Sequence, residues 1–164
     1  MNLILFDVPK YRTFLKPLTL TRPVAGLRCG ILTVGEKWEQ RLGAEASFLT
    51  ETYLREKFTT RYTEDNLYVN ASCLPDDALT STVQALNTGE SLYCGNDLAA
   101  YRTADHLDYG FEPGAGAGRK EYPAPVSFLR ELPHLFLNNG REIGEDFTLL
   151  SRSRASEKMT DPHT

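Results

Sequence analysis

The sequence has few of the residues that disulfide-linked, metal-bound or membrane proteins depend on. Its 164 residues include three cysteines and three histidines, and no CxxC motif or Cys/His pair stands at metal-ligand spacing. An odd number of isolated cysteines indicates free thiols in a reducing cytoplasm. No apolar run approaches the ~18 residues of a membrane helix, and the N-terminus lacks both a basic leader and a small-residue cleavage site. We therefore expect a cytoplasmic protein with no membrane partner.

Net positive charge is limited to one segment of the chain. The net charge is −4, yet residues 1–34 carry five basic side chains and a single acid, so this segment stands at +4 and the remainder at −8. Nucleic-acid binders are usually basic over a whole face or domain. The distribution argues against a nucleic-acid partner and points to a small anion such as a phosphorylated ligand. A solvated loop with paired charges is the alternative.

Apolar runs alternate with amphipathic segments along the chain. The continuous run at 2–7 is typical of a buried strand in a parallel sheet. Alternating strands and helices predict an α/β domain with a mainly parallel sheet. We assign residues 1–150 to this domain and the polar residues 151–164 to a linker or tail. Further strands are predicted at 45–50, 66–72, 90–95 and 97–102, the last two as a hairpin, and helices at 34–43, 51–58, 74–87 and within 124–150.

A rigid, cationic loop at 8–23 follows the first predicted strand and contains the stretch "FLKPLTLTRP". Ligands of parallel sheets bind at the carboxyl ends of the strands, where this loop begins. Arginines can clamp a phosphate in a fork, and threonine hydroxyls or free amides can complete a cradle. Pro17 and Pro23 reduce the entropy cost of holding the loop in shape. The candidate ligand-binding residues are Asp7, Arg12, Lys16, Thr19, Thr21, Arg22 and Arg28.

A second loop, "YGFEPGAGAGRKEYP" at 109–123, is rich in glycine. It lacks the GxxxxGK[ST] pattern and does not lead from an apolar strand directly into a helix, so we do not interpret it as a phosphate-binding loop. We expect a flexible excursion of the chain, of the kind that orders over a ligand.

The segment "LKPLTLTRPVAGLRCG" resembles the first signature of sugar nucleotidyltransferases, with Leu15, Pro17, Leu18, Thr19 and Pro23 matching as they stand. Together with "SFLTETYLREKF" and "NLYVNASCLPDDAL", it is similar to the N-terminal domain of a bacterial family. That family resembles the bifunctional N-acetylglucosamine-1-phosphate uridyltransferase/glucosamine-1-phosphate acetyltransferase and is also labelled glucose-1-phosphate thymidylyltransferase-like. The resemblance covers about residues 1–155.

This resemblance implies a Rossmann-like, three-layer α/β/α fold of the nucleotide-diphospho-sugar transferase type. It implies attack by a sugar-1-phosphate oxygen on the α-phosphate of a nucleoside triphosphate, with release of pyrophosphate and help from Mg²⁺. The expected partners are therefore the nucleoside triphosphate and the sugar 1-phosphate. In the family, a left-handed β-helix follows and forms a trimer. We expect that β-helix to be missing from this chain and residues 151–164 to begin the linker toward it.

On this resemblance, the predicted catalytic residues are Arg12 and Arg22, and Asp7 is the predicted metal ligand. The predicted substrate- or phosphate-binding residues are Lys16, Thr19, Thr21, Arg28 and Asn70.

The chain departs from the family pattern at three places. "DVPKYR" replaces the glycine-rich G-x-G-T-R, Val24 replaces a lysine, and Asn70 stands where typical members have a metal-binding aspartate. Val8 and Pro9 obstruct the close backbone approach that glycines allow, and an amide is a poorer Mg²⁺ ligand than a carboxylate. Turnover therefore stays open. The alternatives are a domain that binds nucleotides or nucleotide sugars without catalysis, and a structural module attached to a β-helix acyltransferase.

Overall fold

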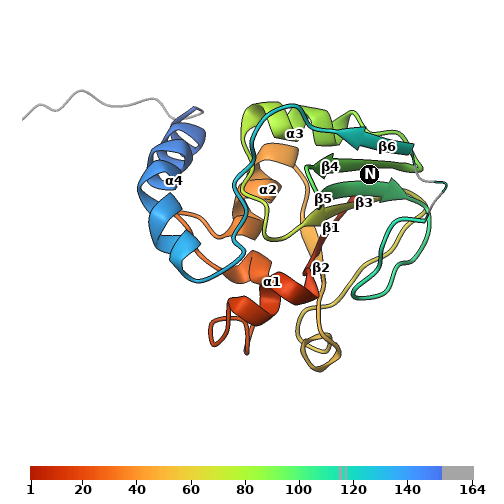
Figure 1. Cartoon of the computed structure of the whole chain (residues 1–164), viewed down its shortest axis with the longest axis horizontal. Coiled ribbons are helices and arrows are strands. Elements are labelled where there is room, and N and C mark those ends of the chain that lie inside the picture. Colours follow the sequence, from red (N-terminus) through yellow and green to blue (C-terminus); the bar gives the residue numbers. More distant parts are fainter. Residues whose placement is uncertain (115, 117, 153–164) are drawn as a thin grey trace, which may run out of the picture.

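A single six-stranded sheet in the order β2-β1-β3-β5-β4-β6 runs through the molecule (Figure 1). The computed structural model describes residues 1–114, 116 and 118–152. Within these residues, β1 pairs in parallel with β2 and β3, β4 pairs in parallel with β6, and β5 runs antiparallel to β3 and β4. The predicted α/β fold with a mainly parallel sheet is confirmed. The strands are β1 (Asn2–Phe6), β2 (Ala46–Leu49), β3 (Asn66–Asn70), β4 (Glu90–Cys94), β5 (Asp97–Thr103) and β6 (Gly118–Glu121).

In the part of the chain that the structure describes, four α-helices accompany the sheet: α1 (Pro9–Phe14), α2 (Val34–Leu42), α3 (Asp77–Gln84) and α4 (Pro133–Ser151). The prediction for α2 is confirmed, and its ends have clear local causes. Thr33 and Glu36 form a reciprocal capping box at its start, and Gly43, with φ of 61°, ends it in the left-handed conformation. None of the described helices is long and apolar enough to cross a membrane.

Three local predictions were wrong, and one of them is the flexible excursion expected at 109–123, because that segment contains β6, which pairs with β4. The segment 8–23 is not a loop throughout, because α1 occupies its first part with Pro9 in the first turn, where a fixed φ suits a helix. The segment 51–58 forms only a 3₁₀ turn at Thr52–Leu54. Leu54 is the buried side chain of that turn, so there is no apolar stripe to stabilise a longer helix.

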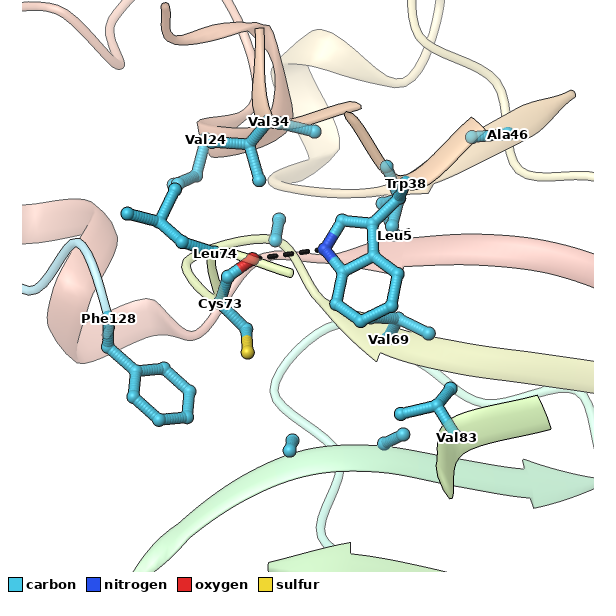
Figure 2. Close-up of a cluster of buried hydrophobic side chains, with 14 of the residues drawn as sticks. Leu5, Val24, Val34, Trp38, Ala46, Val69, Cys73, Leu74, Val83 and Phe128 are labelled. Carbon is cyan, nitrogen blue, oxygen red and sulfur yellow. Dashed lines mark hydrogen bonds between the residues drawn. The ribbon is translucent and has the colours of Figure 1, made fainter. Parts of the chain in front are cut away.

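The core lies on both faces of the sheet, because successive β1 residues alternate between two apolar clusters. Leu3 and Leu5 belong to the larger cluster, which includes Trp38 of α2. The Trp38 indole N–H donates to the Cys73 carbonyl oxygen at 3.0 Å (Figure 2), so even the largest buried ring has its polar atom satisfied. On the opposite face, Ile4 and Phe6 pack in a smaller, aromatic cluster against residues that include 107, 109 and 111.

Candidate functional site

A hollow of about 510 Å³ opens at the carboxyl ends of β1, β3 and β4, and we call it the strand-end hollow. Its lining comes from the end of β1 and the start of α1 (residues 6–11), from Asn70 after β3, from Tyr93 with residues 96–98, and from residues 110–113. Because β5 is antiparallel to its neighbours, its amino end lies at this same edge and brings the hairpin turn into the wall. Part of the glycine-rich segment 109–123 also contributes to the wall.

Lys10 supplies a positive charge in the lining. It is exposed, and among the described residues no carboxylate lies within salt-bridge distance of it. An ammonium group with three donors and no protein acceptor is suited to bind an anionic ligand.

A hydrogen-bonded group of three side chains lies beside Lys10: two of them line the strand-end hollow, and the third, Arg130, lines an adjacent hollow that Lys10 and Tyr11 also border. Asp97 accepts hydrogen bonds from the Tyr11 hydroxyl group and from the Arg130 guanidinium group. The guanidinium carbon lies 5.9 Å from the Tyr11 ring centre and 5.0 Å from that of Phe128. Burial raises the pKa of Tyr11 above its ordinary value, and the hydrogen bond to Asp97 adds to the rise, so the hydroxyl group stays a proton donor. This group holds its orientation before any ligand arrives.

Asn70 lines the hollow but is almost fully buried, at 1% exposure. Its Nδ2 donates to the Leu98 carbonyl oxygen at 2.9 Å, and its Oδ1 accepts from the Ser72 N–H at 2.9 Å. The amide therefore joins the end of β3 to the start of β5. It shapes the floor of the hollow, with both of its polar atoms bonded to protein.

Asp7 also reaches the lining, and it is fully engaged by protein donors. One carboxylate oxygen accepts from Arg12 Nη1 at 2.9 Å and from Thr50 Oγ1 at 2.6 Å, and the other accepts from the Val24 N–H at 2.9 Å. Burial raises the pKa of the Asp7 carboxyl group, although the hydrogen bonds from Thr50 and Val24 and the charge of Arg12 act in the opposite direction.

Arg12 has no exposed side-chain surface and binds the loop that follows α1. Besides Asp7, it donates to the Arg22 carbonyl oxygen at 3.0 Å and to the Thr19 carbonyl oxygen. It also donates to the Tyr53 hydroxyl group at 2.9 Å. The Thr19 hydroxyl group donates back to the Arg12 carbonyl oxygen at 2.9 Å. These hydrogen bonds fix the shape of residues 15–23. The Arg12 and Thr19 donors that make them are the ones that the sequence alone predicts to bind a phosphate.

The structure thus brings only some of the predicted site residues together. Asp7 and Asn70 line the hollow, and Arg12 and Thr19 are buried behind it. The remaining four are exposed and lie outside the lining, and they stay predictions: Lys16, Thr21, Arg22 and Arg28. Of these, Arg28 donates to the Ile31 carbonyl oxygen.

Sequence reasoning missed Lys10, Tyr11, Asp97 and Arg130. A signal existed for Asp97, because a predicted hairpin next to a parallel strand can carry its turn to the ligand edge of the sheet. No signal existed for Arg130, which comes from a distant segment that packs beside α1.

The described residues do not fit a resident Mg²⁺ ion as they stand. Among them, no group of three or more His, Cys, Asp or Glu side chains could hold a metal. Asp7 has both carboxylate oxygens bonded to protein donors, and Asp97 is bonded to Tyr11 and Arg130. Magnesium demands near-octahedral oxygen coordination, which such occupied carboxylates do not offer.

A family model described as sugar nucleotidyl transferase matches residues 3–155, which include the four described helices and all of the described sheet except Asn2. No curated protein matches the chain. Since the family model spans most of the sequence, the chain belongs to the sugar nucleotidyl transferase family.

Proposed function

We propose that the strand-end hollow binds a nucleoside triphosphate and a sugar 1-phosphate, and that the chain transfers the nucleotidyl group between them. A phosphate oxygen of the sugar 1-phosphate attacks the α-phosphorus, a new P–O bond forms, and the bond to the β-phosphate breaks to release pyrophosphate. The observation that carries this proposal is a hollow of about 510 Å³ at the carboxyl ends of parallel strands in a chain of this family.

Transfer of this kind depends on positioning and on positive charge around the phosphoryl oxygens. We assign the phosphate contact to Lys10, because this residue lines the hollow and has no salt-bridge partner among the described residues. Arg130 stands next to it, 45% exposed and oriented by Asp97. Arg12 acts as a positioning residue, since its hydrogen bonds hold the loop under the site.

Magnesium enters this proposal with the substrate. Mg²⁺ is commonly bound through substrate phosphates with one or two carboxylates rather than by an all-protein cage. We therefore expect the nucleoside triphosphate to bind as its Mg²⁺ complex. The closer resemblance to the bifunctional enzyme, the trimeric β-helix of a longer form and the cytoplasmic location belong to the proposal as well.

A second candidate is binding without turnover, and the Asp7–Arg12 pair favours it. The carboxylate and the guanidinium group predicted to do chemistry are bonded to each other, and both are 0% exposed. Because the buried Asp7 and Arg12 side chains are bonded to each other, a chain with this arrangement would keep the hollow for binding but lose catalysis.

One experiment separates the two candidates. The protein is incubated with Mg²⁺, a panel of nucleoside triphosphates and a panel of sugar 1-phosphates, and both pyrophosphate release and thermal shift are measured. A ligand at 100 times its dissociation constant adds about 2.7 kcal/mol to stability. Lys10→Ala should lower kcat/KM by about tenfold to a hundredfold, as expected from the loss of a charge-assisted contact. Lys57→Ala, which removes an exposed lysine outside the hollow, should leave it unchanged.

The outcomes are distinct. Pyrophosphate release that depends on Lys10 supports nucleotidyl transfer. A saturable thermal shift that Lys10→Ala abolishes, with no product, supports binding alone. A panel that gives neither product nor shift overturns both candidates.

A further inference from the structure

Helix α4 packs Leu135 against the core, but it also buries two acidic side chains and leaves three large apolar side chains exposed. The two residues of α4 that are buried are Glu142 and Asp146. Phe136, Leu137 and Phe147 are 82%, 78% and 65% exposed. In Figure 1 the helix lies at the edge of the molecule, away from β6 at the far end of the sheet. Acidic side chains buried beside exposed aromatic side chains invert the usual pattern of a helix packed on its own core over this part of α4.

A polar network explains why this inverted orientation is stable. Asp146 Oδ2 accepts from the N–H groups of Ile31 and Leu32 at 2.8 and 3.0 Å, and its other oxygen binds the Lys37 ammonium group. Glu142 Oε2 lies 3.0 Å from Lys37 Nζ. These contacts fix the rotation of α4 about its axis, so its apolar side cannot turn toward the core.

Helix α4 lies so close to the loop around Gly30 that only glycine fits at that position. Gly30 has φ of 91°, and a Cβ added to it would lie 2.5 Å from Asp146 Oδ2. Docking of the polar face is therefore specific, and the outward face is a defined surface rather than a frayed end.

The outward face forms one stripe along the helix. Phe136, Gly140, Ile143 and Phe147 follow one another at intervals of four, three and four residues, which places them on one side of an α-helix. A Cβ added at Gly140 would meet no atom within 4 Å, so the middle of the stripe is open. The stripe contains no charged residue, and covering it would bury no ion.

The size of this surface fits a protein interface. With aromatic side chains of 150–250 Å² each, the exposed parts of Phe136, Leu137, Ile143 and Phe147 amount to roughly 500 Å² of apolar area. Monomers rarely expose contiguous apolar patches larger than a few hundred Å². Two such surfaces facing each other, each the stripe with Leu137 beside it, contribute about 1,000 Å², which is about the area that a specific interface must reach.

We propose that α4 is a homodimer interface, in which the stripes of two copies pack antiparallel about a twofold axis between positions 141 and 142. In this register Phe136 of one copy faces Phe147 of the other, and Ile143 faces Gly140. The Ile143 side chain of each copy fills the open space at Gly140 of the other. The two Phe136–Phe147 pairs lie at the two ends of the interface. The same patch serves both copies, so this contact closes at two copies, separately from a trimer formed through the β-helix of a longer form. This interface is independent of the proposed reaction.

Sedimentation velocity of the full chain tests the proposal. We expect a reversible dimer with twice the monomer mass of 18.4 kDa. Phe136→Glu combined with Phe147→Glu should raise the dimer dissociation constant by about a hundredfold or more, as for loss of central interface anchors. Phe14→Glu is the matched control, because Phe14 is 58% exposed on α1, outside the stripe. It should leave the dimer intact, and circular dichroism should show all variants folded.

Disulfide trapping tests the register. In the antiparallel arrangement, a mixture of Gly140→Cys and Ile143→Cys chains should form a mixed disulfide on oxidation, since close approach at the glycine brings the two Cα atoms within bridging distance. A parallel arrangement would instead link Gly140→Cys chains to each other. A wild-type chain that stays monomeric at submillimolar concentration overturns the proposal. So does a dimer that survives the double glutamate variant, because it must form elsewhere.

Discussion

Two buried ion clusters in this molecule differ in the distance along the chain over which they act. The strand-end cluster is Asp7 with Arg12 and their bonded neighbours, and its central pair is five residues apart. The helix-docking cluster is Lys37 with Glu142 and Asp146, and its Lys37–Asp146 contact spans 109 residues. The Asp7, Arg12, Lys37, Glu142 and Asp146 side chains are at most 4% exposed. The first cluster shapes the floor of a site around a pair that is close in sequence, whereas the second decides which face of a distant helix points outward.

The clusters also differ in charge balance. Arg12 faces one fully buried carboxylate, and Glu51, the second, is 31% exposed. Lys37 faces two buried carboxylates, Glu142 and Asp146, and the N–H groups of residues 31–32 donate to Asp146. Removing the lysine therefore weakens the pairing of two buried carboxylates, of which Glu142 keeps Arg141, whereas removing the arginine leaves one buried carboxylate without its counterion.

The largest effect is expected from Lys37→Met. Breaking a buried ion pair by removing one partner costs about 3–5 kcal/mol, and here Asp146 loses its counterion while Glu142 keeps only Arg141. Urea unfolding should show this loss. Lys10→Met is the control, since a surface lysine with no ion pair among the described residues should change stability by no more than about 0.5 kcal/mol. A Lys37→Met variant as stable as Lys10→Met would refute a docking role for this cluster.

The alkylation rate of the Cys29 thiol reports which part of the structure opens in the Lys37→Met variant. Burial raises the pKa of the Cys29 thiol to about 11, and the Glu142 carboxylate adds to the rise. Its Sγ lies 3.6 Å from the Leu135 carbonyl oxygen of α4. In Lys37→Met, Cys29 should be alkylated before the core thiol of Cys73, because α4 leaves the body before global unfolding. Equal labelling rates would mean that the whole domain opens at once. Because the thiolate reacts, labelling of an opened site should rise with pH.

Arg12→Met should have the next largest effect, about 3 kcal/mol, because it leaves Asp7 buried without its counterion and frees the carbonyl groups of Thr19 and Arg22. Hydrogen exchange should accelerate first in residues 15–23. Adding Asp7→Asn should restore part of the stability, since it removes the stranded charge. A double variant less stable than Arg12→Met alone would show that Asp7 acts through something other than this pair.

A surface pair provides the smallest effect and a reference for both clusters. Arg102 binds Asp65 through two hydrogen bonds of 2.7 and 2.8 Å, but Asp65 is 34% exposed. Asp65→Asn should therefore cost only about 0.5 kcal/mol at neutral pH. The hydrogen bonds from Arg102 lower the pKa of Asp65 below its ordinary 3.8. Its stabilisation is present above pH 3.8 and is lost as the pH falls through the lower folded-state value.

The acid dependence supplies the check for that pair. The difference in unfolding free energy between wild type and Asp65→Asn should shrink as the pH is lowered below 3.8. A difference that grows on acidification would contradict the lowered pKa.

Local patterning predicted most of the sheet and the helix at 34–43, because alternation, capping residues and a turn glycine act within a few residues of each other. The site was predicted less well. Arg12 satisfies the same chemistry with a buried carboxylate as with a phosphate, and residue type alone cannot say which anion it meets. The Arg130–Asp97 contact and the contacts of α4 join residues more than 30 positions apart, and such contacts produce no periodic pattern in the sequence.

The two edges of the sheet are protected against aggregation in different ways. An unpaired edge strand is a template for another chain unless it is covered or charged. The outer side of β2 is covered by the following segment, since Phe48 N–H donates to the Thr59 carbonyl oxygen at 3.2 Å and Thr60 Oγ1 donates to that of Phe48 at 2.6 Å. At the other edge, β6 is short, fully exposed and reads Gly-Arg-Lys-Glu. Growth of the sheet into fibrils is therefore disfavoured at both ends.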